Sequence, residues 1–179
     1  MTFRRMLTAL LALAAGPALA VQAPAPAAPP ADPCAGVEFH EFDFWAGSWD
    51  VYGPKGKQVA NSLIEKVYGC GIRENWMPFG AAGGGSLNIY VPGAKHWEQF
   101  WIDSGGTRAL FVGGLKGKDM VIQGEWGGPL VRITYTPNAD GSVRQYGEQS
   151  TDGGKKWAPS FDLLYRPHPA GAAFPTPQG

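Results

Sequence analysis

Apolar and polar residues alternate in short runs along most of the chain, from about Gly47 onward. A period of two is typical of β-strands with one buried face, and Gly, Pro, Asn and Asp between the runs favour tight turns. No segment has the period of an amphipathic helix of ordinary length. The runs that we expect to form strands are Ser48–Tyr52, Gln58–Tyr68, Gly71–Met77, Ser86–Val91, His96–Asp103, Thr107–Leu115, Met120–Trp126, Leu130–Thr136, Val143–Ser150 and Trp157–Tyr165.

This succession of strands predicts an all-β fold. About ten strands that follow one another through tight turns favour a single antiparallel up-and-down barrel. Closing the barrel removes the unpaired edges that a long open sheet would expose.

The segment Glu38–Tyr52 is the most aromatic part of the chain, with six aromatic residues in fifteen. A buried aromatic side chain removes about 150–250 Å² of surface from water, so a cluster this dense requires a core to pack against. We predict that its first half forms a short aromatic plug at one end of the barrel. The second half, from Gly47, would enter the first strand, with Trp49 closing the barrel floor.

Several expected strand faces mix Trp or Tyr with polar side chains, whereas the core of a solid sandwich would favour Val, Ile and Leu. Mixed faces of this kind are typical of a wet or ligand-holding cavity. They also fit a barrel whose polar residues face solvent beside half-covered tryptophans. The residues that we expect to contact a ligand are Trp76, Asn88, Tyr90, Trp97, Gln99 and Trp101.

The fifth run gives the most specific prediction. A period of two keeps Trp97, Gln99 and Trp101 on one face, and paired tryptophans are costly to leave in water, so this face should point inward. The opposite face should meet water. Phe100 and Ile102 on that face would need cover from the plug, a loop or a partner chain.

The two ends of the chain differ in composition from the barrel region. Residues 1–20 combine Arg4 and Arg5, a short apolar run and a small-residue cleavage site, which together predict a secretory signal peptide. Residues 21–33 should form a flexible Ala/Pro-rich linker and residues 167–179 a flexible Pro-rich tail. The barrel domain would then span residues 34–166, in a protein exported to the periplasm or the extracellular space.

Loss of the leader leaves 13 basic and 15 acidic residues, a net charge of −2. We therefore expect no nucleic-acid partner and no membrane association after cleavage. Cys34 and Cys70 are the only cysteines, and two cysteines in an oxidising compartment usually pair, so we predict a disulfide. Two free buried thiols are the alternative. Two cysteines are too few for a metal site, and we expect none.

A set of motifs recurs in the same order in a known group of proteins. The motifs are F-D-F-W-x-G-x-W-x-V (residues 42–51), E-N-W (74–76), S-x-N-x-Y (86–90), W-x-Q-x-W-x-D (97–103), V-R-Q (143–145) and S-T-D-G-G-K-K-W (150–157). In these motifs the chain resembles a family of exported bacterial proteins of unassigned function. That family is itself similar to the calycins, the lipocalin and fatty-acid-binding-protein barrels. Lipocalins share a G-x-W near the first strand, which Gly47-Ser48-Trp49 matches. The resemblance covers residues 34–166 and implies a small antiparallel barrel without implying a reaction.

Two further motifs point to structure rather than to chemistry. The stretch Ser150–Trp157 matches the Asp-box of sialidase propellers, but it occurs once, so we expect a hairpin in which Asp152 caps the turn. The glycine-rich stretch Gly80–Gly85 lies between two strands and lacks the following helix of a phosphate-binding loop. We expect it to be a flexible loop at the barrel mouth.

Haem would require an axial ligand, and none of the three histidines lies mid-strand on a tryptophan-bearing face. We therefore expect no cofactor. The histidines are His40, His96 and His168.

Catalysis by carboxylates is the remaining chemical possibility. Paired carboxylates of unequal pKa would suit acid–base work. Inward faces could carry Glu74, Asp103 and Glu148, with Arg73, Arg132 and Arg144 as charge partners. The candidates for catalysis among them are Glu74, Glu148 and Arg144.

Three functions fit the sequence. The favoured one is an exported barrel that binds a small, partly apolar molecule in its interior. The alternatives are an enzyme that acts on a small molecule through inward Glu and Arg residues, and a structural or interaction barrel without a ligand. An internal cavity would argue against the structural reading, and two inward carboxylates at one cavity would favour the enzyme. The sequence predicts no oligomeric state.

Overall fold

The computed structural model describes residues 31–80 and 83–174. The expected signal peptide, most of the Ala/Pro-rich linker and the last five residues of the tail lie outside these ranges. Within them, no helix is both long enough and apolar enough to cross a membrane.

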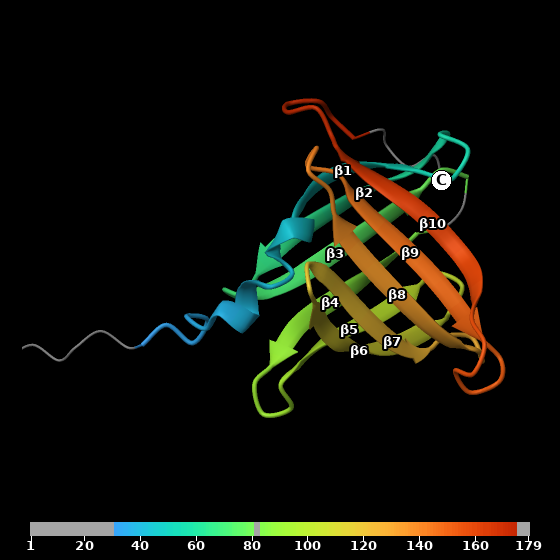
Figure 1. The fold of residues 1–179 in the computed structure, drawn as a ribbon. Helices are drawn as coiled ribbons and strands as arrows, with labels where there is room; N and C mark the ends of the chain where they lie inside the picture. The colour runs from blue at the N-terminus through green and yellow to red at the C-terminus, as the bar shows by residue number, and fades with distance from the viewer. Residues whose placement is uncertain (1–30, 81–82, 175–179) are drawn as a thin grey trace, which may run out of the picture. The chain divides into compact units, whose positions relative to one another are not determined.

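The described residues form one closed, fully antiparallel barrel of ten strands (Figure 1). Each strand pairs with its sequence neighbours, and β10 closes the barrel against β1. All ten expected strands are confirmed, and their ends lie within two residues of the expected ones, because a barrel buries one face of every strand and so preserves the period of two. The strands are β1 (Gly47–Tyr52), β2 (Gln58–Val67), β3 (Gly71–Pro78), β4 (Gly84–Val91), β5 (His96–Asp103), β6 (Arg108–Lys116), β7 (Asp119–Glu125), β8 (Leu130–Pro137), β9 (Val143–Ser150) and β10 (Ala158–Pro167).

The up-and-down order places alternate turns at opposite ends of the barrel. One end, the plug end, carries the β2–β3, β4–β5, β6–β7 and β8–β9 turns together with the start of β1 and the end of β10. The other end, the mouth, carries the remaining five turns. The glycine-rich β3–β4 connection is one of these, and residues 81 and 82 within it lie outside the described ranges.

The aromatic segment before β1 closes the plug end, as predicted. It forms two short 3-10 helices, η1 (Val37–His40) and η2 (Asp43–Trp45). Phe42 and Trp45 are fully buried with their rings stacked 4.9 Å apart, and both also pack against aromatic side chains of the barrel strands. The indole N–H of the buried Trp49 donates to the Trp45 carbonyl at 3.0 Å, which ties β1 to the plug.

The predicted disulfide between Cys34 and Cys70 is present. Cys70 lies in the β2–β3 turn, so the bond fastens the start of the plug to the plug end of the barrel. His40 adds a second tie, because its Nε2 is 3.0 Å from the Cys34 carbonyl oxygen and its Nδ1 is 2.9 Å from Asp43 Oδ2.

Two of the charged residues considered for catalysis lie on the outer surface. Glu148 pairs with Arg132 (Oε2–Nη2 2.8 Å), and Arg144 pairs with Asp162 (Nη2–Oδ2 2.7 Å). The expectation that Glu148 and Arg144 reach the interior is therefore wrong. Val143, Gln145 and Gly147 of β9 are buried instead, because a charged side chain costs more to bury than these small or neutral ones do.

The outer faces of β4, β5 and β6 carry an apolar strip. Phe100 and Ile102 are 43% and 55% exposed, next to the exposed Leu87, Ile89 and Leu110. No segment within the described ranges covers them. The sequence predicts that the plug, a loop or a partner chain covers Phe100 and Ile102. Neither the plug nor a described loop does so.

The motif at the β9–β10 turn has the expected structural role. Asp152 Oδ1 accepts the backbone N–H groups of Lys155 and Lys156 at 3.0 and 2.9 Å. Gly153 and Gly154 adopt φ values of 72° and 85°, which a glycine takes without strain. The motif thus closes a hairpin at the mouth.

The barrel contacts continue beyond Arg166, where the sequence placed the start of the tail. β10 extends to Pro167, and the backbone N–H of His168 donates to the Ser48 carbonyl at 2.8 Å. The His168 ring is also within 2.7 Å of Asp50 Oδ1 on β1.

Candidate functional site

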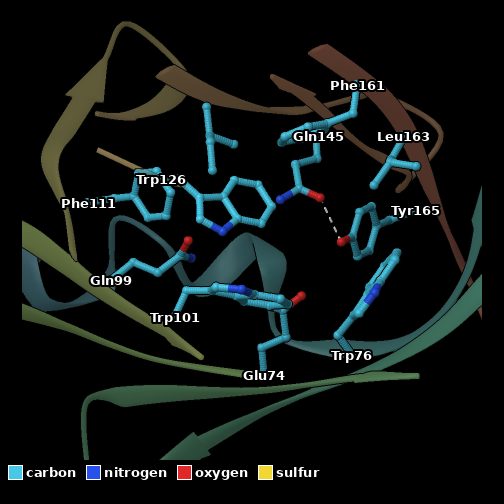
Figure 2. Close-up of a pocket in the computed structure, with 11 residues that line it drawn as sticks. Glu74, Trp76, Gln99, Trp101, Phe111, Trp126, Gln145, Phe161, Leu163 and Tyr165 are labelled. Carbon is cyan, nitrogen blue, oxygen red and sulfur yellow. Dashed lines mark hydrogen bonds between the residues drawn. The ribbon is translucent and has the colours of Figure 1, made fainter. Parts of the chain in front are cut away.

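A cavity of about 180 Å³ lies inside the barrel, on the side of the mouth (Figure 2). Its walls come from six strands and the β7–β8 turn, so only the closed barrel assembles it. The lining residues are Glu74, Trp76, Gln99, Trp101, Phe111, Trp126, Ile133, Gln145, Phe161, Leu163 and Tyr165.

Aromatic rings make up most of the wall. Trp126 lies edge-on to Trp101 at 6.1 Å and to Phe161 at 6.4 Å between ring centroids. Trp76 lies 6.3 Å from Tyr165 on the next side of the cavity. Separations of this size are favourable for aromatic pairs, so the rings support one another around the space that they enclose.

Two glycines make room for these rings. A Cβ on Gly147 would lie 2.3 Å from the Phe161 ring, and a Cβ on Gly84 would lie 2.7 Å from the Trp101 ring. The orientation of Trp101 is further fixed by Asp103, whose Oδ2 accepts the indole N–H at 3.2 Å. Asp103 also accepts two backbone N–H groups of the β5–β6 turn, so it belongs to the rim of the mouth rather than to the interior.

A polar layer separates the cavity from the plug. Gln99 Nε2 donates to Asn88 Oδ1 at 2.7 Å and to the Tyr135 hydroxyl at 3.2 Å. Gln145 Nε2 donates to the same hydroxyl at 3.0 Å, and Gln145 Oε1 accepts the Tyr165 hydroxyl at 2.7 Å (Figure 2). Buried polar groups are costly unless they are hydrogen-bonded, so this layer is rigid only as a connected whole.

Glu74 is the charged end of the polar layer. Its side chain is 5% exposed, and Figure 2 shows its carboxyl group pointing from β3 toward the cavity. Oε2 accepts the Ser86 hydroxyl at 3.0 Å, and Ser86 in turn accepts an N–H of Asn88 at 3.0 Å. Burial raises the pKa of Glu74 to about 7, and the interactions with the Ser86 and Ser62 hydroxyls offset only part of that effect.

The charge on Glu74 also acts on the neighbouring phenols. Burial raises the pKa values of Tyr135 and Tyr165 well above their usual range, and the Glu74 charge raises them further. Both tyrosines therefore stay neutral at ordinary pH, while Glu74 changes its charge near neutrality.

Comparison with models of known protein families gives no match. No curated protein matches the chain either.

Of the residues predicted to contact a ligand, three line the cavity and a fourth supports it. Trp76, Gln99 and Trp101 are in the wall, and Asn88 lies behind them in the polar layer. The period of two predicts the inward faces of β3, β4 and β5, and these faces bring the four residues together.

Tyr90 and Trp97 need a correction, because they lie at the plug end and not at the cavity. Trp97 is 1% exposed, packs edge-on against Phe42 at 5.7 Å, and donates its indole N–H to the Glu38 carbonyl at 3.2 Å. Tyr90 packs edge-on against Phe39 at 5.4 Å. Both point inward, but the plug occupies the space that a ligand would need there.

The sequence prediction missed the wall contributed by the second half of the barrel. Phe161, Leu163 and Tyr165 alternate along β10, and this period of two was a usable signal. Gln145 is on the buried face of β9. Trp126 gave no such signal, because it follows β7 in a turn and only the folded turn shows where its ring points.

The site does not have the carboxylate pair expected of an acid–base enzyme. Among the residues lining the cavity, Glu74 is the only one with an ionisable carboxyl group. Across the described ranges, no group of three or more His, Cys, Asp or Glu side chains is placed to hold a metal ion. The three histidines make contacts with Asp43, Glu98 and Asp50, away from the cavity.

Proposed function

We propose that this chain is an exported barrel that binds a small, mostly apolar molecule in the cavity behind its mouth. The observation that carries the proposal is the cavity itself, enclosed by Trp76, Trp101, Trp126 and Phe161 in a barrel whose other end is filled by its own plug. Concave, largely aromatic sites with a few placed polar groups are the usual form of small-molecule sites.

The size of the cavity limits the ligand. A cavity of about 180 Å³ is smaller than the range of about 300–1,000 Å³ that is usual for drug-sized ligands. A dry protein cavity of about 150 Å³ is known to hold benzene. We therefore expect a ligand with one ring or a short branched chain.

Export and family membership are part of the same proposal. The N-terminal pattern of Arg4, Arg5 and a short apolar run supports a cleaved leader, and the disulfide supports folding in an oxidising compartment. The closed ten-strand barrel is compatible with the calycin-like family that the sequence motifs resemble. Mass spectrometry of the secreted protein should find an N-terminus directly after Ala20.

Titration calorimetry with benzyl alcohol tests the binding function. This probe has one ring and one polar group, and it should bind the parent protein at a single site. Ile133→Phe fills the cavity and should abolish binding, and Trp101→Ala should weaken it. Trp157→Ala changes a tryptophan of the β9–β10 hairpin outside the cavity and should leave the affinity unchanged.

Two results would overturn the proposal. The first is binding of the probe that is unaffected by Ile133→Phe, which would place it elsewhere on the protein. The second is no detectable binding of any single-ring probe to the parent, which would leave the structural reading of the barrel.

A further inference from the structure

Glu74 has no positively charged neighbour in the cavity. None of the residues lining the cavity is Lys, Arg or His. Arg73, the residue before Glu74 on β3, points outward and pairs with Glu65 on β2 at 2.6 Å. The groups that stabilise the Glu74 carboxyl group are neutral hydroxyls: Ser86 donates to it at 3.0 Å, and the Ser62 hydroxyl lies beside it. An ionised carboxylate in such surroundings lacks the counter-charge that buried carboxylates normally have.

The aromatic wall of the cavity favours the same kind of ligand as the Glu74 carboxylate does, namely a cation. The faces of aromatic rings are electronegative, and they attract a cation that lies within about 6 Å of the ring centroid. Trp76 and Trp101 flank Glu74 in Figure 2, and Trp126 and Phe161 close the opposite side. An anion would meet the Glu74 carboxylate with no positively charged side chain in the cavity wall to balance it.

We propose that the ligand of this cavity is a small organic cation, an ammonium group that carries one ring or a short alkyl chain. The ammonium group lies against the Glu74 carboxylate at the base of the cavity, and its substituent packs among the tryptophans toward the mouth. This inference rests on the proposed binding function and adds the charge of the ligand to it.

Three probes of nearly equal size separate charge from shape. Benzylammonium, benzyl alcohol and benzoate share the ring and differ in charge, and each is titrated into the parent protein by calorimetry at pH 8. We expect benzylammonium to bind at least tenfold more tightly than benzyl alcohol, because it adds a charge-assisted contact to the same ring contacts. Benzoate should show no binding.

The Glu74→Gln variant tests the contact between the ammonium group of the ligand and the Glu74 carboxylate. The variant keeps the shape of the side chain and its capacity to accept the Ser86 hydroxyl, so the cavity should keep its shape, and benzyl alcohol serves as the neutral reference in the same variant. The affinity for benzylammonium should fall to the level of benzyl alcohol. Glu148→Gln removes a carboxylate from the outer surface and should change neither affinity.

The pH profile gives an independent readout. The titratable groups that face Glu74 are Tyr135 and Tyr165, which both remain neutral over this range, so Glu74 alone should govern the response. With a pKa of about 7, its ionised fraction falls about tenfold between pH 8 and pH 6. The affinity for benzylammonium should fall by a similar factor in the parent and stay level in Glu74→Gln.

The outcomes separate the two proposals. If benzyl alcohol binds at the cavity as tightly as benzylammonium, or benzoate binds most tightly, the inference of a cation is overturned while the binding function stands. A preference for benzylammonium that survives Glu74→Gln overturns the inference as well. If none of the three probes binds the parent protein, both proposals fail.

Discussion

Replacement of Glu74 by Gln should change how the stability of the barrel depends on pH. The folded protein raises the pKa of Glu74 from its ordinary value of 4.5 to about 7. Between these values the folded state holds a proton that the unfolded state has released, so stability must fall as the pH rises through this window. At about 1.4 kcal/mol for each pKa unit, the loss from pH 4.5 to above pH 7 is about 3 kcal/mol.

The variant should lose this dependence. Gln is neutral at every pH and retains an oxygen to accept the Ser86 hydroxyl, so at pH 5 the two proteins should have similar free energies of unfolding. At pH 8 the parent buries a carboxylate charge that the variant lacks. Glu74→Gln should then be the more stable protein by about 3 kcal/mol.

Urea denaturation of both proteins at pH 5, 6, 7 and 8 measures the difference directly. Other titrating groups are common to both proteins and cancel in the subtraction. Glu148→Gln, a change on the outer surface, should follow the parent at every pH. Parallel curves for the parent and Glu74→Gln would refute the reasoning, because they would show that the carboxyl group is not strongly desolvated.

Three other changes test the fold around the site. Trp49→Ala should cost about 3–5 kcal/mol in urea denaturation, as large truncations in cores do, and an unchanged midpoint would show that the ring is not part of the core. Replacing Cys34 and Cys70 by Ser should cost about 4 kcal/mol by loop entropy for their separation of 36 residues; an unchanged melting temperature would contradict this. Gly147→Ala should cost about 1–3 kcal/mol and weaken benzyl alcohol binding, because its Cβ would meet a phenylalanine ring of β10. Gly114→Ala, where a Cβ meets no atom within 4 Å, is the matched control, and equal effects at the two glycines would refute the crowding argument.

The fold could be predicted from the sequence because its signals are local. Each strand carries its own period of two, and the glycine-rich turns divide the strands from one another. Closure can be predicted from the number of strands, and the disulfide from the presence of two cysteines in a chain with an expected secretory leader. The plug could be placed because no loop leaves rings such as Phe42 and Trp45 in water.

Only about half of the candidate site could be predicted. The pattern of a single strand does not show whether an inward side chain lies beside the plug or beside the cavity. Trp97 and Trp101 share an inward face, yet one packs against the plug and the other lines the cavity. Alternation along β5 predicts the direction of these two side chains, but it does not predict what lies opposite them. The isolation of Glu74 from any cation was equally hidden, because it depends on residues from six strands that meet only in the closed barrel.

The pairing of β1 with β10 has a consequence for the order in which the barrel folds. Every other pair of neighbouring strands is a hairpin that can form as soon as its two strands are available, whereas β1 must wait for the last strand of the chain. Pairing β1 with β10 closes the longest loop in the barrel, and it costs more chain entropy than forming any hairpin. We therefore expect the β1–β10 seam to close late. The plug must wait as well, because Trp45 packs against rings of β8 and β10. Until the seam closes, the sheet of hairpins has an unpaired edge at β1. During this period the chain is most prone to associate with another copy of itself.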